Sequence, residues 1–101
     1  MKNPYKLLSD NGFNIRYGHY TDDDKFPLLI YLGAGSNNVL ADNIVYHSDN
    51  LYQLELCYLE KNEELEKQLE KVLNDNEIIW EKSEDVYIDT ENFYVIYYEL
   101  G

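Results

Sequence analysis

The chain has 101 residues, a formal net charge of −12 and 45% hydrophobic residues. That length fits a single domain over residues 1–101, and the hydrophobic content indicates a folded core rather than disorder. The negative charge argues against direct nucleic-acid binding and against docking on a membrane, because anionic phosphates and lipids attract clustered lysine and arginine. No stretch approaches the roughly 18 apolar residues of a membrane span.

The charge is unevenly distributed along the chain. Residues 1–59 hold seven acids and four bases, whereas residues 60–101 hold thirteen acids and four bases. The second half is therefore expected to form a negatively charged surface, toward which a basic partner would be steered. The one cysteine, Cys57, lies inside an apolar run and is expected to be a buried thiol.

The first third of the chain predicts a short helix and two strands. Residues 4–9 begin with a proline suited to a first helical turn, and Asn11-Gly12 supplies a helix stop. Residues 13–20 alternate apolar and polar side chains, which indicates an edge strand. Residues 26–32 are continuously apolar, so we expect a strand that is covered on both faces.

The stretch Gly33-Ala34-Gly35-Ser36-Asn37-Asn38 follows this apolar run, as a phosphate-binding loop would. A dinucleotide fingerprint needs a third glycine and a following helix, and a P-loop needs Gly-Lys-Ser/Thr. Neither pattern is present, and residues 39–46 are rich in strand formers. We therefore predict that residues 33–38 form a mobile, exposed loop between two antiparallel strands, without a bound ligand.

The second half of the chain predicts one long helix between strands. Residues 51–60 alternate as a strand whose second face, residues 52, 54, 56 and 58, is wholly apolar and must be core. Residues 62–76 form an amphipathic helix with the apolar stripe Leu65, Leu69, Val72 and Leu73 and with Asn62 as its N-cap. Residues 77–82, 85–89 and 93–100 are expected to be strands.

Together these elements predict an α+β domain. An antiparallel or mixed β-sheet should carry the short N-terminal helix and the longer amphipathic helix on one face. One helix stripe cannot cover five or six strands, and residues 26–32 and 93–100 are apolar on both faces, so we expect a partner to cover the second face. We expect an outward tyrosine, Tyr94 or Tyr97, to belong to an assembly surface together with Gly33, Ala34, Gly35, Ser36, Asn37 and Asn38.

No group of residues predicts a reaction. His19 and His47 each stand without a second ligand at metal-binding spacing, and Asp22-Asp23-Asp24 lacks the offsets of a calcium loop. A catalytic pair of either histidine with Cys57 would need an exposed thiol. We expect no catalytic residue, no metal, no cofactor and no small-molecule substrate, and hence a protein that is not an enzyme.

The order of elements resembles a known family. A Pro-led apolar strand, "FPLLIYL", precedes a "YQLEL" strand that runs into "EELEKQLEKVL", and the hairpin "DVYIDTENFYVIYYEL" closes the pattern. Over nearly the whole chain, this pattern is similar to the tail-completion (tail terminator) proteins of long-tailed bacteriophages and prophages. The resemblance implies a structural protein with no catalytic residues to carry over.

In that family, copies form a ring, usually of six, that caps the tail tube and meets the head-side connector. The resemblance thus implies a head–tail joining role at the head–tail junction of a virion, after assembly in the bacterial cytoplasm. The partners would be further copies of the chain and other tail or connector proteins. Connector and minor capsid proteins of similar size are alternatives within the same class.

A protein of a different class fits the charge equally well. Small, acidic, tyrosine-rich domains also serve as inhibitors, DNA mimics or immunity-type proteins that bind a basic partner. The charge of residues 60–101 suits that function. Self-association separates the two hypotheses, because a ring-former should assemble and a mimic should stay monomeric or dimeric.

Overall fold

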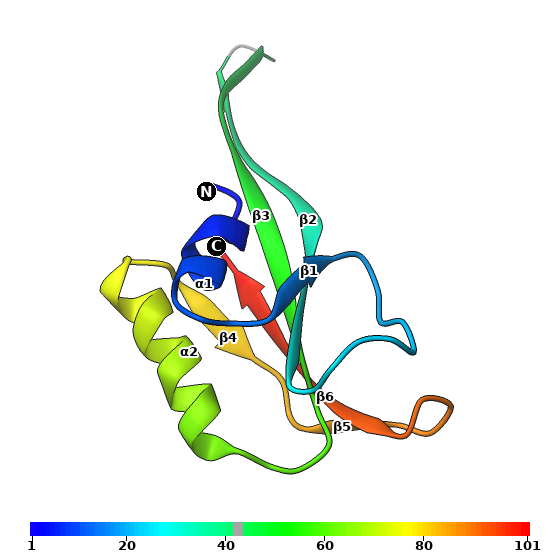
Figure 1. The fold of residues 1–101 in the computed structure, drawn as a ribbon. Coiled ribbons are helices and arrows are strands. Elements are labelled where there is room, and N and C mark those ends of the chain that lie inside the picture. The colour runs from blue at the N-terminus through cyan, green and yellow to red at the C-terminus, as the bar shows by residue number, and fades with distance from the viewer. Residues whose placement is uncertain (42–43) are drawn as a thin grey trace.

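A computed structural model describes the backbone of residues 1–41 and 44–101, and the side chains of these residues apart from 37–41 and 44–48. The elements along the chain are α1 (Tyr5–Asp10), β1 (Ile15–Tyr17), β2 (Leu28–Ala41), β3 (Ile44–Tyr58), α2 (Glu63–Asp75), β4 (Trp80–Lys82), β5 (Val86–Ile88) and β6 (Phe93–Leu100). Figure 1 shows a twisted sheet with both helices on one side. The predicted α+β class is confirmed.

The sheet is mixed and has the strand order β1-β2-β3-β6-β4, with β5 also paired to β6. Strand β1 runs parallel to β2, and the other pairs are antiparallel. The sequence predicts separate strands at 26–32 and 51–60. The first strand in fact continues to Ala41, and the second begins earlier, at Ile44. Both belong to one long hairpin, in which Leu28 pairs with Cys57 and Ala41 with Ile44.

Strands β4 and β5 act as one interrupted edge strand along β6. The register passes from Lys82 opposite Tyr98 to Val86 opposite Val95, which leaves one extra residue on the edge side. At this bulge Ser83 makes two hydrogen bonds to β6. Its amide donates to the Tyr97 carbonyl at 2.8 Å, and its hydroxyl accepts from the Tyr97 amide at 2.9 Å. Such a bulge bends an edge strand and discourages pairing with another edge.

The main core lies between the sheet and the helices. The Asn62 side chain accepts from the Leu65 amide at 3.1 Å, so it is the N-cap of α2, as predicted. Leu69 and Leu73 are fully buried, and Leu65 and Val72 pack partly buried against the same cluster. The predicted stripe of α2 therefore faces the sheet. The apolar face of β3 meets it, with Leu54, Leu56 and Tyr58 buried and Tyr52 packed alongside.

The opposite face of the sheet is covered by the connection between β1 and β2. Tyr20 and Phe26 from this connection pack on Phe93, with ring centroids 4.9 and 5.2 Å away. They close a second cluster made of Leu28, Ile30, Cys57, Phe93 and Val95. The expectation that the apolar second faces of residues 26–32 and 93–100 need a partner is therefore wrong, since a polar-looking loop carries two aromatic rings onto them.

This covering loop is held by one acidic side chain. Asp24 accepts two bonds from Arg16 Nη1, at 2.6 and 2.7 Å, and a third from the Thr21 amide at 2.8 Å. Burial alone would raise the pKa of Asp24, but the Thr21 and Arg16 hydrogen bonds outweigh it and hold the pKa below its usual value. The aspartate run is thus only partly a solvated loop.

Candidate functional site

The hairpin of β2 and β3 extends well beyond the rest of the sheet. Strand β1 accompanies β2 only as far as Tyr31, and β6 accompanies β3 only from Tyr52 to Tyr58. Residues 34–41 and 44–51 therefore form a two-stranded ribbon, called the arm below, which rises past α1 and the C-terminus (Figure 1). An isolated two-stranded ribbon is at best marginally stable in water. The arm is the part of the fold that intramolecular packing explains least.

The glycine-rich stretch lies at the base of the arm, and it is not a loop. Residues 33–38 belong to β2, so the prediction of a loop between two strands is wrong. Ala34 and Gly35 stand opposite Leu51 alone, between the pairs Gly33–Tyr52 and Ser36–Asn50. This is a β-bulge, and Gly35 adopts φ 88°, which glycine tolerates best. The glycines therefore bend the hairpin where it leaves the sheet.

Two chain ends support the base of the arm. The Met1 ammonium donates to the Asn50 carbonyl at 2.8 Å and lies 3.7 Å from the Asp49 carboxylate. The Gly101 amide donates to the Ile79 carbonyl at 3.0 Å. The N-terminal segment, the end of β6 and the α2–β4 connection thus meet beside the arm, although they are far apart in sequence.

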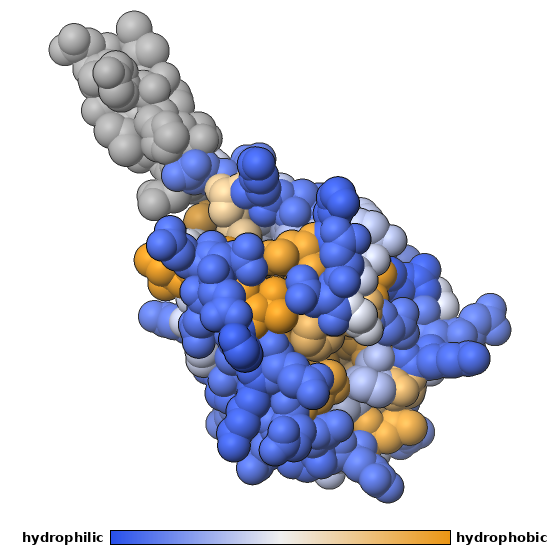
Figure 2. All heavy atoms as spheres, turned by 60° about the vertical axis from the view of Figure 1, so that its left-hand side comes forward, coloured by the Kyte–Doolittle hydropathy of each residue, from blue (hydrophilic) through white to orange (hydrophobic). Residues whose placement is uncertain are grey.

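An apolar groove opens between these segments. Its hollow of about 570 Å³ is lined by Leu7, Ile78 and Ile79 and bordered by Lys2, Lys6, Asp10 and Glu77. Ile79 is 71% exposed, more than any other large hydrophobic side chain of the described surface. Figure 2 shows the helix-bearing side, where hydrophobic side chains lie in a hollow between hydrophilic ones. A volume of this size is within the range of about 300–1,000 Å³ of binding clefts.

The predicted tyrosines lie far from the arm. Tyr94 is at the opposite end of the sheet, 40% exposed, and it stacks on Tyr58 with ring centroids 5.6 Å apart. Tyr87 packs on its other side at 4.9 Å. Tyr97 points to the other face, beside the half-buried Glu55. Of the two candidates, Tyr94 is therefore the exposed one, and the structure does not bring it together with residues 33–38.

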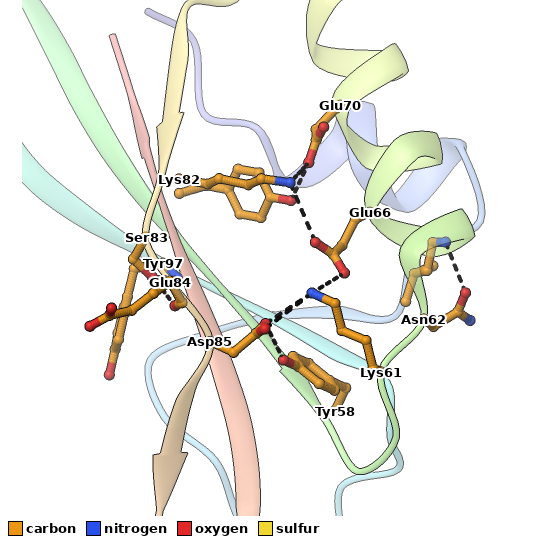
Figure 3. A network of polar contacts seen from close by, with 12 residues as sticks. Tyr58, Lys61, Asn62, Glu66, Glu70, Lys82, Ser83, Glu84, Asp85 and Tyr97 are labelled. Carbon is orange, nitrogen blue, oxygen red and sulfur yellow. Dashed lines mark hydrogen bonds and ion pairs between the residues drawn. The ribbon is translucent and has the colours of Figure 1, made fainter.

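A network of alternating charges joins α2 to the edge strand (Figure 3). The Glu66 carboxylate, only 6% exposed, lies 2.7 Å from Lys61 Nζ and 3.4 Å from Lys82 Nζ. Lys61 also reaches Asp85 at 3.0 Å, and Lys82 reaches Glu70 at 2.8 Å. Two tyrosine hydroxyls complete the network, from Tyr58 to Asp85 and from Tyr98 to Glu70.

The network stabilises the charged forms of Asp85 and Lys82 and the neutral form of Tyr98. The hydrogen bond from Tyr58, followed by that from Lys61, lowers the pKa of Asp85. The bond to Glu70 raises the pKa of Lys82. Burial, followed by the bond to Glu70, raises the pKa of Tyr98, so this phenol is neutral at physiological pH. Every charge has an opposite partner, so the arrangement is a clamp between helix and sheet and not a poised acid–base pair.

The remaining chemical candidates are not brought together. Cys57 is buried, and burial raises the pKa of its thiol to about 12, which makes it unreactive. His19 is exposed on the loop after β1, and the side chain of His47 lies outside the described ones. Among the described residues, no group of three or more histidine, cysteine or acidic side chains could hold a metal ion.

Two features escaped the sequence analysis. The amphipathic pattern predicts that the acids of the helix are solvated, but Glu66 is buried. It lies one turn from Leu69 on the buried side, and that spacing is a usable signal. Ile79 was assigned to a strand over residues 77–82, whereas β4 begins at Trp80 and Glu77 has φ 57°. Ile79 lies in the connection before β4, where side chains do not alternate between two faces. Its exposure could therefore not be predicted from periodicity.

Comparison with protein-family models, with curated proteins and with solved structures gives no match. No described helix has the length and apolarity that crossing a membrane requires.

Proposed function

We propose that this chain is a structural protein of the head–tail junction of a long-tailed bacteriophage or prophage, and that it acts in tail completion by assembling into a ring. The arm supports this proposal best. A two-stranded ribbon without a third strand has little reason to persist in a monomer, but it gives an assembly protein a long contact surface. The proposal includes contacts with other tail or connector proteins and no catalytic step.

The acidic surface supports an inhibitor less well than the sequence alone suggested. Glu66, Glu70 and Asp85 are bound to lysines, and Asp75 pairs with Lys71 at 2.7 Å. These carboxylates are less available to a basic partner than a fully solvated helix face would be. Binding of a basic protein is the alternative if the test below fails.

The test is complementation of a phage or prophage from which this gene has been deleted, with the particles counted by electron microscopy. The wild-type chain should restore joined heads and tails. Tyr94→Asp and a variant with a shortened arm should not, although thermal melts should show both variants folded. Deleting residues 34–37 alone is unsuitable, because Ser36 and Asn37 are paired with β3 and their loss would shift the hairpin register.

Tyr94→Phe and Leu59→Asp are matched controls. The first keeps the ring stack on Tyr58, and the second places a charge on another exposed hydrophobic position, which is 55% exposed. Both should restore particles. Normal particles without the gene, or from both Tyr94→Asp and the short-arm variant, would contradict the proposal.

A further inference from the structure

We propose that the arm of one copy of this chain lies in the apolar groove formed by Leu7, Ile78 and Ile79 on a second copy. This inference rests on the proposed ring assembly and identifies the two surfaces that meet. Four properties carry it: the amino-acid composition of the arm, the charge of the groove, the reach of the arm and the length of chain that the arm contributes.

The arm has the composition of a strand pair that needs cover. Residues 34–51 include two acids and no lysine or arginine, whereas the rest of the chain holds all 8 bases and all but two of the 20 acids. Low charge combined with the strand formers of residues 39–46 favours association of a ribbon with another protein surface. Beyond Gly33 and Tyr52, neither β1 nor β6 supplies a third strand.

The groove is the hollow that an acidic copy can approach most easily. Its bordering side chains are balanced, with Lys2 and Lys6 against Asp10 and Glu77. Four other hollows of the described surface each carry more acidic than basic side chains. In a chain with a net charge of −12, a neutral apolar groove is where two copies repel each other least.

The exposed tyrosines at the other end of the sheet fit the arm less well. Tyr94 and Tyr87 offer aromatic surface, but Asp85, Asp89 and Glu91 lie close to them in sequence or contact. An arm whose only charges are aspartates would be repelled there. Aromatic area alone would favour the tyrosines as the docking surface for the arm, whereas charge favours the groove. Since the arm carries no base to offset that repulsion, we assign it to the groove.

The arm is long enough to cross a neighbouring copy. Eight residues of β2 beyond Gly33 extend about 26 Å at ~3.3 Å per residue, and the molecule measures 50 × 30 × 23 Å along its principal axes. The 8 described residues on each strand of the arm, 34–41 and 44–51, supply more than half of the roughly 20–30 residues a side of a stable protein interface. Because arm and groove are different surfaces, each copy can give one arm and receive one, which generates a ring or a filament.

Disulfide capture between two variants tests this contact. One copy carries Ser36→Cys or Asn38→Cys on the arm, and a second, size-tagged copy carries Ile79→Cys. Only an intermolecular arm–groove contact gives the mixed cross-link. Native Cys57 contributes no background, because it is 1% exposed. The matched control replaces Ile79→Cys by Leu59→Cys, another exposed hydrophobic position at a distance from the groove.

We expect the Ile79→Cys mixture to give several-fold more mixed cross-link than the Leu59→Cys mixture. In sedimentation, Ile79→Glu should weaken self-association about tenfold or more, and Leu59→Glu should not change it. Equal cross-linking in the two mixtures would overturn the inference. Particle assembly that depends on the gene but tolerates Ile79→Glu would also overturn it, while leaving the proposed function intact. Particle assembly without the gene would instead contradict the proposed function.

Discussion

Strands β2 and β3 pass through two different environments within one hairpin. Near Leu29, Leu54 and Leu56 they are central strands, flanked by β1 and β6 and buried between the helices and the loop over residues 18–27. Beyond Gly33 and Tyr52 the same strands pair only with each other. Packing against the two cores accounts for the stability of the rest of the chain, which is called the body below. It does not account for the stability of the arm.

The two regions differ in the contacts that hold them in place. The body combines a two-sided core with a charge network that ties α2 to the edge strand. The arm has a bulge that sets its direction and a composition low in charge. Under the proposed function, the length and direction of the arm would serve contact with another molecule.

Truncating a core leucine should have the largest effect on the body. Leu69→Ala removes a fully buried side chain of α2 and should lower the free energy of unfolding by about 2–5 kcal/mol, measured by denaturant melts. Lys67→Ala, on the exposed side of the same helix, should change it by less than about 0.5 kcal/mol. A Leu69→Ala effect below about 0.5 kcal/mol would mean that α2 does not build the core.

The charge network should contribute less than the core. Glu66→Ala leaves Lys61 and Lys82 with one carboxylate each, and we expect a loss of about 1–3 kcal/mol, the range for hydrogen bonds to charged groups. The partial exposure of both lysines limits the loss. Gln68→Ala, which is exposed on α2, is the control. A neutral result for Glu66→Ala in the same melts would show that the helix is held by its apolar stripe alone.

Acid should weaken the body through Asp85 and Asp24. Both carboxyls have a pKa below the ordinary value when folded, so their contribution is present above about pH 4 and is lost as pH falls through the folded pKa. Asp85→Asn should flatten this decline in pH-dependent melts, and Asp23→Asn, in the exposed loop, should not. Parallel curves for the wild type and Asp85→Asn would exclude the network as its cause.

Where one hydrophobic periodicity dominates, the sequence was sufficient to predict the secondary structure and burial of the body. The i, i+4, i+7, i+8 spacing of the apolar residues of α2 and the two-residue alternation of residues 51–58 each allow one burial pattern, and the structure has both. The fold class and the N-cap at Asn62 followed from the same rules. Burial of Cys57 was also predicted correctly, because a small apolar thiol inside a strand has few other places to lie.

The arm and the second core could not be read from the sequence, for two physical reasons. Glycines with positive φ occur in turns and in bulges alike, so the Gly33–Gly35 stretch favoured a loop although Gly35 belongs to a bulge. Coverage of Phe93 by Tyr20 and Phe26 depends on long-range packing of an irregular loop, which has no period. Assigning those apolar faces to a partner was therefore reasonable from the sequence and wrong in fact.

Shortening the arm should have the smallest effect on stability, and it tests most directly whether the arm contributes to the folding of the body. Replacing residues 38–48 by Asn-Gly joins the paired residues Asn37 and Asp49 through a two-residue turn that keeps the hairpin register. The variant keeps every contact of the two cores, so its free energy of unfolding should stay within about 0.5 kcal/mol of the wild type. In the intact chain, amide hydrogens of the arm should exchange faster than those of residues 52–58, because a lone ribbon opens without unfolding the body.

A loss above about 1.5 kcal/mol on shortening, roughly a core-methylene-sized cost, would show that the arm stabilises the body and would remove the main reason to assign it to another molecule. Unchanged stability together with lost self-association would instead separate folding from assembly within a single hairpin.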